Sequence, residues 1–373
     1  MKVLTLNKIS PLAGKELGEN YQLDEKAVSP EAILVRAYNM HEFDFDANTK
    51  FVARCGAGVN NIPLDKCAQK GIIVCNTPGA NSNAVKELAV SFLTMCGRKI
   101  AQGIKWTQGL KDGETSVQEQ VEAGKKDFVG GEIAGKTLGV VGLGVIGKKV
   151  AKAAMALDMK VIYYMHRDAR GDENFPQGAE AVTLEELFKQ SDYITLHVPL
   201  LPTTKGIINA KTISSMKKGV NIINTARGEL VVDEDIIEAV KSGHVNRYCT
   251  DFPNQKLLGY ENIITTPHIG ASTPEAEDNC AVIAAQQLKQ FDINKNIVNS
   301  VNFPCVSLKT TGQAVLVLFS GNGEGLQQAA RNWKLNGKVI KSDGKYGAAK
   351  FDFAEKALPQ LFEGIDGVLK VYL

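Results

Sequence analysis

Apolar and polar positions alternate along most of the chain in a pattern that predicts repeated strand–helix units. In residues 31–100 the strand-like runs AILVRAY, KFVARCGAGVNNI and GIIVCNTPG are followed by the helical pattern NAVKELAVSFLTMCGRKI. Strands spaced by helices in this way form parallel sheets. We therefore predict a first α/β lobe built on a parallel sheet.

A second series of the same kind extends from Lys136 to about His268. Its strand-like runs are KTLGVVGLG, MKVIYYM, SDYITLHVPL, GVNIINTARG, VNRYCTDF and NIITTPHIG, and helical segments separate most of them. Between the two series, residues 108–132 are polar and punctuated by glycine, which indicates a surface segment. The predicted fold class is α/β, with two doubly wound parallel-sheet lobes of the Rossmann or flavodoxin type.

The last hundred residues begin with a long helical pattern, STPEAEDNCAVIAAQQLKQFDI. Ser272 or Thr273 can cap this helix, and Pro274 suits its first turn. From about residue 304 the order of elements changes to β-α-β-β-α-β, which is typical of a small ferredoxin-like domain. A third domain is therefore expected at the C-terminus.

Composition and charge narrow the class of protein. The chain is 44% hydrophobic and 23% charged, as soluble globular proteins are, and its net charge of +2 gives no basic field for nucleic acid or a membrane surface. Its seven cysteines form no CxxC pair and no metal-ligand spacing, which is typical of free thiols in a reducing compartment. We find neither a signal-like segment nor an apolar run of the roughly 18 residues that cross a membrane, so we expect a cytoplasmic protein without a metal.

The segment LGVVGLGVIGKKVAKAA contains the spacing G-x-G-x-x-G at Gly142, Gly144 and Gly147. The first glycine permits a tight turn, the second lets the backbone approach a pyrophosphate, and the third lets helix and strand pack closely. Val145 and Ile146 then lie at the positive end of the following helix, where phosphates bind. Because a strand precedes the glycines and a helix follows them, we predict a dinucleotide site.

The choice between NAD and NADP depends on the end of the next strand, KVIYYMHRDAR. An acidic residue that binds the ribose hydroxyls is expected there, but Met165 occupies that position and His166 and Arg167 follow it. Arg167 could pair with a 2′-phosphate, or it could be a solvated loop charge. NAD is favoured slightly and NADP stays open.

Two further side chains come at the ends of strands in the second series. Arg227 follows the run NIINTA, and His268 follows NIITTP. Ligands of open α/β sheets bind at the carboxyl ends of strands, where a guanidinium can grip a carboxylate and an imidazole can transfer a proton. Two such residues on one nucleotide-binding sheet favour a catalytic pair over two structural side chains.

The segments GLGVIG, HVPLLPTTKGIIN, NTARGELV, TDFPN and PHIGASTPEAEDN resemble the D-isomer-specific 2-hydroxyacid dehydrogenases in order and spacing. The N-terminal RCGAGVNNIPLDKCAQKGIIVCNTPGANSNAVKELA is similar to the substrate lobe of that family, and the chain is most similar to members that act on D-3-phosphoglycerate. The resemblance implies a substrate-binding domain in residues 1–97, completed by 273–303, and a dinucleotide-binding domain in 98–272. Residues 304–373 resemble the regulatory ACT domain of many such members.

The resemblance also implies roles for individual residues. Arg227 would bind the substrate carboxylate and carbonyl, and His268 would exchange the hydroxyl proton. Backbone N–H groups of Ala57 and Gly58 would hold the carboxylate. The other residues expected to contact ligands are Arg36 and Arg54 at the phosphate, Asp251 at the nicotinamide carboxamide, Gly270 and Ala271 beside the nicotinamide, and His166, Arg167, His197 and Thr225 elsewhere along the cofactor.

One departure from the family concerns the partner of His268. The family has a glutamate that hydrogen-bonds this histidine, whereas the corresponding stretch here is TDFPNQKLLGYENI, with Lys256 at the aligned position. Without that carboxylate the protonated imidazole loses a charge partner. Asp251 or Glu261 could replace it in the folded chain.

A second departure lies in the C-terminal domain. The loop FSGNGEGL keeps Asn322 and Gly325 of the ligand loop found in ACT domains, but it has Glu324 where those domains have proline. Val339 stands where relatives inhibited by serine have a polar contact. These changes argue against serine feedback.

The expected activity is the NAD(P)-dependent oxidation of D-3-phosphoglycerate to 3-phosphohydroxypyruvate, the first step of L-serine biosynthesis. A glyoxylate/hydroxypyruvate reductase, or another D-2-hydroxyacid dehydrogenase, is the alternative within the same chemistry. A protein that binds NAD(H) as a sensor without turnover is the alternative of another class. The resemblance further implies a homodimer or homotetramer.

Overall fold

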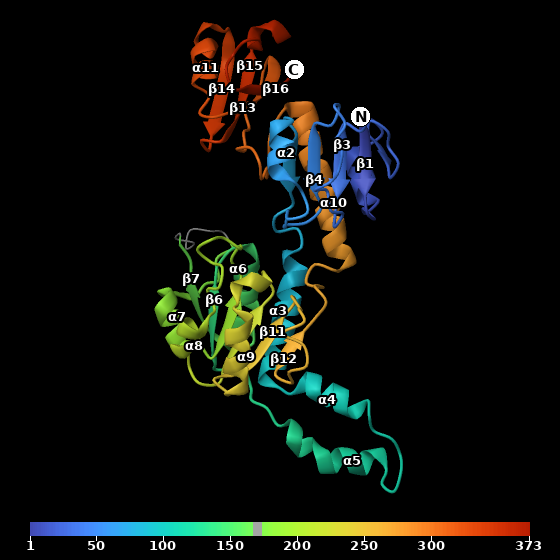
Figure 1. Ribbon diagram of the computed structural model, residues 1–373, viewed down its shortest axis with the longest axis vertical. Helices are drawn as coiled ribbons and strands as arrows, with labels where there is room; N and C mark the ends of the chain where they lie inside the picture. The colour runs from blue at the N-terminus through green and yellow to red at the C-terminus, as the bar shows by residue number, and fades with distance from the viewer. Residues whose placement is uncertain (167–173) are drawn as a thin grey trace. The chain divides into compact units, whose positions relative to one another are not determined.

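The computed structural model describes residues 1–166 and 174–373, which form two compact units (Figure 1). The first unit contains residues 1–81 and 273–373, and the second contains residues 82–272. Helix α3 (Ser82–Gly97) belongs to the second unit, because it packs its buried face in the core of that unit.

The first unit is built on a five-stranded parallel sheet. Its strand order β2-β1-β3-β4-β5 is that of a flavodoxin-like fold, so the first predicted lobe is confirmed. The strands are β1 (Lys2–Leu6), β2 (Gln22–Asp24), β3 (Ala32–Val35), β4 (Phe51–Arg54) and β5 (Ile73–Asn76). The helices of this lobe are α1 (Leu12–Leu17), α2 (Leu64–Gln69) and α10 (Pro274–Asn294).

Helix α10 starts as its sequence predicts. The Thr273 hydroxyl accepts a hydrogen bond from the Ala276 N–H at 3.1 Å, and Pro274 occupies the first turn. Thr273 rather than Ser272 is therefore the cap. One face of the helix is buried against α1 and β4, which fixes its first turns beside the carboxyl end of the sheet.

The C-terminal part of the first unit is a four-stranded antiparallel sheet in the order β14-β15-β13-β16. Its elements are β13 (Gln313–Ser320), α11 (Glu324–Ala329), the 3₁₀ turn η3 (Ala330–Asn332), β14 (Leu335–Ser342), β15 (Tyr346–Phe353), η4 (Pro359–Phe362) and β16 (Val368–Tyr372). The strand order is that of the predicted ferredoxin-like domain. The prediction of a second helix in this domain is wrong, since only the single turn η4 forms there. The cause is Pro359, which has no N–H to donate and restricts Leu358 to an extended conformation.

The two faces of this small sheet are both covered. One face packs against α11 around Phe319, Phe351 and Phe353. The other face contributes to the apolar core of the first lobe, where the Tyr372 ring lies edge-on to Phe291 at 5.1 Å. The small sheet is therefore joined to the lobe by a shared core, and not only by a linker.

The second unit is built on a seven-stranded parallel sheet in the order β12-β11-β10-β9-β6-β7-β8, the doubly wound Rossmann arrangement. The strands are β6 (Thr137–Val141), β7 (Lys160–Tyr164), β8 (Glu180–Ala181), β9 (Tyr193–Leu196), β10 (Val220–Asn224), β11 (Val245–Thr250) and β12 (Ile263–Thr265). The remaining helices are α4 (Ile100–Thr107), α5 (Val117–Gly124), η1 (Lys125–Phe128), α6 (Val145–Ala156), α7 (Leu184–Gln190), α8 (Ala210–Ser214), η2 (Gly228–Leu230) and α9 (Asp233–Lys241). The second predicted lobe is confirmed.

The polar segment between the two series is more ordered than its composition indicates. Helix α5 forms inside it because Ser116 and Glu119 make a capping box. Together with α4 it forms a helical arm, residues 100–128, that extends away from the sheet of the second unit (Figure 1). None of the described helices is long and apolar enough to cross a membrane.

Candidate active site

The glycine-rich loop between β6 and α6 has the shape that a dinucleotide requires. Gly142 has a φ of +96°, and a Cβ added to it would lie 2.6 Å from the carbonyl oxygen of His197. A Cβ on Gly147 would overlap the carbonyl oxygen of Gly142. Gly144, in contrast, faces open space, with no heavy atom within 4 Å of an added Cβ. The first and third glycines are therefore needed for packing, and the second leaves room for a phosphate before α6 begins at Val145.

The end of β10 offers a polar atom to the same ligand. The Thr225 hydroxyl is buried and has no hydrogen-bond partner within the described part of the chain. A buried hydroxyl without a partner costs free energy unless something binds it. The loop glycines and this hydroxyl thus fit a bound NAD, which would supply hydride transfer.

The end of β7 bears on the choice of cofactor. Met165 is half-buried, and His166 is exposed with its Nδ1 3.3 Å from the Tyr164 hydroxyl. Arg167, the candidate partner of a 2′-phosphate, falls outside the described residues. The described part of this strand end therefore presents no carboxylate to the ribose.

Asn224 shapes the loop that carries Arg227. Its amide nitrogen donates to the Arg227 carbonyl at 2.8 Å, and its amide oxygen accepts the Ala226 N–H at 3.1 Å. The Arg227 guanidinium donates to the Ala226 carbonyl at 2.6 Å and is half-buried. The sequence analysis missed Asn224, although an asparagine at the end of a strand is a recognised signal for such a turn.

Asp251 shapes the turn that carries His268. Its carboxylate is 1% exposed and accepts hydrogen bonds from the Thr266 hydroxyl and from the N–H groups of Ile269 and Gly270. His268 has a φ of +52°, an unusual conformation for a residue with a side chain. The three bonds from Asp251 hold this strained turn, so the Asp251 oxygens are engaged in positioning the backbone.

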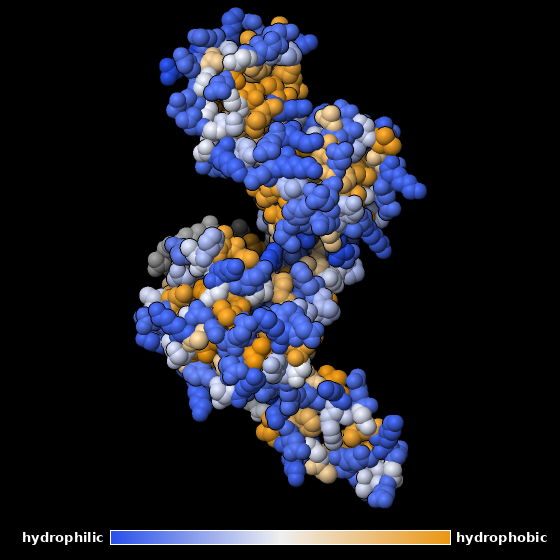
Figure 2. Space-filling model, in the orientation of Figure 1, coloured by the Kyte–Doolittle hydropathy of each residue, from blue (hydrophilic) through white to orange (hydrophobic). Residues whose placement is uncertain are grey.

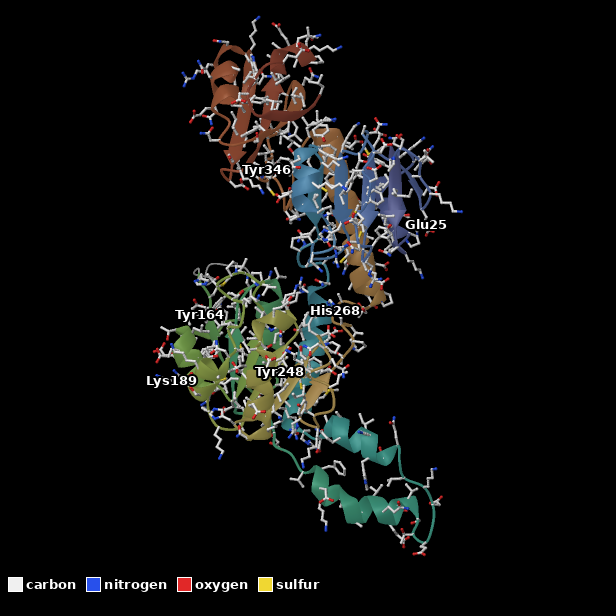
Figure 3. The ribbon with its side chains drawn as sticks, in the orientation of Figure 1. Glu25, Tyr164, Lys189, Tyr248, His268 and Tyr346 are labelled. Carbon is white, nitrogen blue, oxygen red and sulfur yellow. The ribbon has the colours of Figure 1, made fainter. Side chains whose placement is uncertain are left out.

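The His268 imidazole is exposed (Figure 3). Among the residues that the structure describes, none forms a hydrogen bond with it. Its neighbour is the Phe252 ring, with ring centroids 4.8 Å apart. A Cβ on Gly228, the residue after Arg227, would lie 3.3 Å from the Phe252 Cβ. Phe252, which the sequence analysis did not select, therefore lies between the Arg227 loop and His268.

No residue of the described chain replaces the family's glutamate. Lys256, at the aligned position, is exposed and pairs with Glu234 of α9 at 2.5 Å. Glu261 comes before β12, whereas His268 follows that strand, so the two lie at its opposite ends. Asp251 binds the backbone of the turn instead of the ring.

His197 ends β9 beside the glycine loop. Its Nε2 lies 2.9 Å from the Thr195 hydroxyl, and burial lowers the pKa of His197 to about 4. The imidazole is therefore neutral at physiological pH. A neutral ring can accept or donate a hydrogen bond near a cofactor, but it brings no charge to the phosphates.

In the first unit the end of β4 and the loop after it contain Arg54, Ala57 and Gly58, which are expected at the substrate. The N–H groups of Ala57 and Gly58 make no hydrogen bond within the described chain, and the Asn76 side chain holds the Ala57 carbonyl at 2.6 Å. Gly56 has a φ of +146°, and a Cβ there would overlap the Arg54 guanidinium. The chain thus folds Arg54 back over Gly56, next to two free N–H donors.

Arg36, which follows β3, is engaged in an ion pair. Its Nη1 lies 2.7 Å from Oε1 of Glu277 in α10, and the two side chains are 32% and 35% exposed. Nothing in the sequence analysis pointed to Glu277. The cation expected to bind the substrate phosphate is therefore held by a carboxylate in this structure.

The predicted site residues fall into two groups. The second unit places the glycine loop, His197, Thr225, Arg227, Asp251, His268 and Gly270 at or just after the carboxyl ends of parallel strands. The first unit contains Arg36, Arg54, Ala57 and Gly58 at the ends of β3 and β4. Within the described residues no three His, Cys, Asp or Glu side chains cluster as metal ligands do.

Comparison with known proteins identifies relatives of the chain. Residues 100–270 match the family described as D-isomer specific 2-hydroxyacid dehydrogenase, NAD binding domain. The chain is 42% identical to a hydroxypyruvate reductase of Thermotoga maritima over 65% of this chain and 77% of that protein. It is 33% identical to a D-3-phosphoglycerate dehydrogenase of Archaeoglobus fulgidus; the matched region covers 90% of this chain and 64% of that protein.

A solved structure shows the same likeness. The NAD⁺-bound 3-phosphoglycerate dehydrogenase of Entamoeba histolytica superposes with a TM-score of 0.62 at 28% identity, covering 81% of this chain and 98% of that one. Several curated relatives are longer than this chain; for example, it spans 48% of the D-3-phosphoglycerate dehydrogenase of Methanocaldococcus jannaschii, at 39% identity.

Proposed function

Since this chain belongs to the D-isomer-specific 2-hydroxyacid dehydrogenases, a family of NAD-dependent oxidoreductases, we propose that it interconverts D-3-phosphoglycerate and 3-phosphohydroxypyruvate. The observation that carries this proposal is the pair of strand-end residues beside the dinucleotide loop, Arg227 after β10 and His268 after β12. This reaction would begin L-serine biosynthesis.

The two residues divide the work of the reaction. The nicotinamide supplies or accepts the hydride at C2 when bound. Arg227 binds the carboxylate and polarises the carbonyl oxygen with its planar donors. His268 donates a proton to that oxygen on reduction and removes it on oxidation. The turn held by Asp251 supports this role, because it presents the imidazole without tying its nitrogens to the protein.

The first unit would bind the rest of the substrate. The free N–H groups of Ala57 and Gly58 suit the carboxylate, and the Arg54 and Arg36 guanidinium groups suit the phosphate. Guanidinium groups bind phosphate through two parallel hydrogen bonds, which gives both affinity and orientation.

A second candidate substrate is hydroxypyruvate or glyoxylate. One observation favours it: Arg36 is already neutralised by Glu277 at 2.7 Å. The 42% identity to a hydroxypyruvate reductase points the same way. The chemistry at C2 is identical for the two candidates, and only the tail of the substrate differs.

One assay separates the candidates. The protein is mixed with NADH and, in turn, with 3-phosphohydroxypyruvate, hydroxypyruvate and glyoxylate, and the panel is repeated with NADPH. We expect the highest kcat/KM with the phosphorylated acid and a preference for NADH. A higher kcat/KM for glyoxylate would establish the reductase, and a clear NADPH preference would overturn the NAD assignment. NADH binding with no turnover of any acid would establish an NAD(H) sensor.

We propose that the C-terminal sheet acts as an ACT-like effector domain and that the protein works in the cytoplasm as a homo-oligomer. The free cysteines, six of them buried and Cys305 exposed, suit a reducing compartment. Adding serine and other amino acids to the assay tests the effector role. We expect no inhibition by serine, because Glu324 replaces the proline of the ligand loop.

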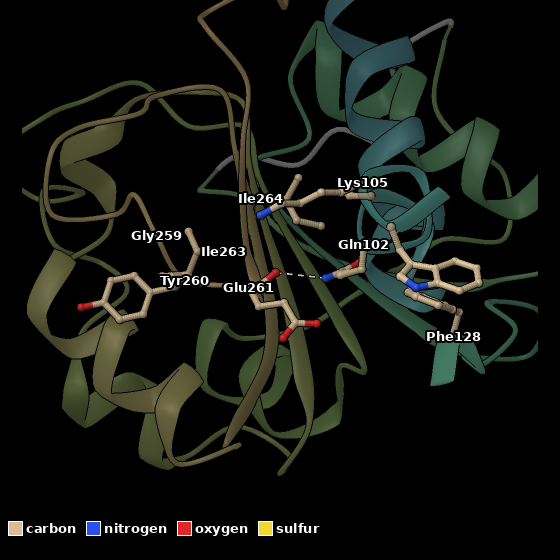
Figure 4. Close-up of a pocket in the computed structure, with 10 residues that line it drawn as sticks. Gln102, Lys105, Phe128, Gly259, Tyr260, Glu261, Ile263 and Ile264 are labelled. Atoms are coloured by element: carbon tan, nitrogen blue, oxygen red, sulfur yellow. Dashed lines mark hydrogen bonds between the residues drawn. The ribbon is translucent and has the colours of Figure 1, made fainter. Parts of the chain in front are cut away.

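The helical arm supports the oligomer. Neither α4 nor α5 has a buried residue, and helices this short need packing to be stable in water. Apolar side chains show on the arm in Figure 2, and Ile104 is 52% exposed. Beside α4 lies a cavity of about 710 Å³ lined by Trp106, Phe128 and Tyr260, and Gln102 donates to the Glu261 carbonyl across it (Figure 4).

These features suit a face that a second copy covers. The molar mass of the protein in light scattering tests this: we expect a dimer or larger species, and a smaller one for Ile104→Glu. A wild-type protein that stays monomeric at high concentration would contradict the oligomer.

A further inference from the structure

The Arg36–Glu277 ion pair is a built feature, because the surrounding chain fixes both partners. Arg36 directly follows β3, and its backbone N–H donates to the Leu6 carbonyl at 3.4 Å. The side chain of Asn7 accepts the N–H groups of the next two residues, Ala37 and Tyr38, at 2.9 and 2.7 Å. The guanidinium is therefore presented from a defined loop.

The backbone position of Glu277 is fixed as well. It lies in the first turns of α10, whose start is fixed by the Thr273 cap. The neighbouring Asp278 accepts the Ser10 hydroxyl at 2.5 Å, and Ala276 is buried. Because the backbone of α10 is fixed, the Glu277 carboxylate can leave Arg36 only by rotation of the Glu277 side chain.

The Arg36–Glu277 pair is unfavourable for a phosphorylated substrate. A phosphate carries close to two negative charges and needs a free cation. Glu277 both occupies the Arg36 guanidinium and adds a like charge beside the place where the phosphate would bind. A substrate with a hydroxymethyl or hydrogen tail meets neither obstacle, because it needs no cation there.

We infer that Glu277 is a positioning residue that tunes substrate specificity: by holding Arg36 at 2.7 Å, it reduces the preference of the site for a dianionic tail over an uncharged one. This inference rests on the proposed function, since it takes Arg36 as the cation for the substrate tail. A phosphorylated acid must displace Glu277 from Arg36, and the difficulty of that exchange determines the preference between the two candidate substrates.

The test compares charge-removing and charge-retaining variants. For each protein the ratio of kcat/KM for 3-phosphohydroxypyruvate to kcat/KM for hydroxypyruvate is measured with NADH. We expect Glu277→Gln to raise this ratio roughly tenfold, mainly through a lower KM for the phosphorylated acid, because one like charge leaves a partly exposed site. Glu277→Asp keeps the charge and should leave the ratio close to that of the wild type.

Glu275→Gln is the matched control. It removes the same charge from the same helix end, but Glu275 is exposed and its carboxylate makes no ion pair within the described chain. We expect its ratio to stay within about twofold of the wild type, because exposed charges are strongly screened. Equal ratios for Glu277→Gln and Glu275→Gln would overturn the inference, since any change would then come from the general charge at the start of α10 and not from the contact with Arg36.

Arg36→Ala separates this inference from the proposed function. If Arg36→Ala lowers the ratio and Glu277→Gln does not raise it, Arg36 binds the tail and only the role of Glu277 is wrong. If Arg36→Ala leaves the ratio unchanged, the assignment of Arg36 itself fails. In the double variant the gain from Glu277→Gln should disappear, because no guanidinium is left to be released.

Discussion

The carboxylate of Asp251 accepts the backbone N–H of Gly270 at 2.7 Å, at the end of the turn that presents His268. The same side chain accepts two more hydrogen bonds and is 1% exposed. Burying a carboxylate costs free energy unless hydrogen-bond donors compensate for the lost water, and these three donors do so. The turn and the carboxylate therefore stabilise each other. Asp251 positions the His268 imidazole through the backbone of the turn, without contacting the ring.

Asp251→Asn should damage this turn. The amide has one acceptor oxygen instead of two, so its NH₂ group faces a backbone donor. We expect a loss of about 2 kcal/mol in the free energy of unfolding and a fall in kcat. Urea unfolding and steady-state assays measure both. Asp235→Asn, at a half-buried carboxylate that accepts the Ala210 N–H, serves as control and should cost less than about 1 kcal/mol.

Gly144→Ala and Gly147→Ala should fail in different ways. A methyl group on Gly144 meets no atom, so this variant should fold normally and bind NADH at least about tenfold more weakly, because the methyl occupies the place of the phosphates. A methyl group on Gly147 overlaps the Gly142 carbonyl and should cost about 1–3 kcal/mol of stability. Thermal unfolding without ligand and NADH fluorescence titration separate the two effects. Equal thermal stability of both variants would contradict the assignment.

His268→Ala should lower kcat by roughly 10²–10⁴-fold while the Kd for NADH changes little, because the imidazole transfers the proton and does not hold the cofactor. Arg227→Ala should raise KM for the acid and lower kcat together. His41→Ala is the control, since His41 is exposed and its imidazole lies within hydrogen-bond distance of the Asn60 carbonyl in the first unit. A wild-type rate for His268→Ala would show that the proton comes from elsewhere.

Stability should fall between pH 7 and pH 5 because of His197. Burial lowers its pKa to about 4, below the value of about 6.5 in an unfolded chain, so the unfolded state binds the extra proton in this range. The stability present above pH 6.5 is therefore lost progressively towards pH 4, by about 2 kcal/mol at pH 5. Urea unfolding at both pH values measures the loss. His197→Asn should lose less over the same interval, and an identical loss would contradict the assignment.

The sequence predicted the architecture well where local patterns decide it. Both parallel sheets, the glycine loop and the start of α10 follow from periodicity and from short motifs, because neighbours along the chain make those structures; the sequence left Ser272 and Thr273 open as the cap. It also placed Arg227 and His268 at strand ends, and the strands bring these ends to one edge of the second unit's sheet.

Other features depend on contacts between distant segments. The Arg36–Glu277 pair joins residues far apart in the chain, and only packing of α10 against the first sheet brings them together. The three bonds of Asp251 and the place of Phe252 beside His268 arise in the same way. Residues 108–132 look like a loop because the arm has no buried face of its own, and the periodic signal of a helix comes from burial.

The shared core beneath the small C-terminal sheet limits how this chain could have evolved. Leu316, Leu318 and Tyr372 pack on residues of the first lobe such as Phe291, and the Tyr372 hydroxyl donates to the Gly71 carbonyl at 2.6 Å. A chain without the C-terminal sheet would expose the apolar surface of the first lobe that the sheet now covers, and it should aggregate. A chimera that takes its C-terminal sheet from another family member should therefore fold well only when the residues on both sides of this shared core are exchanged together.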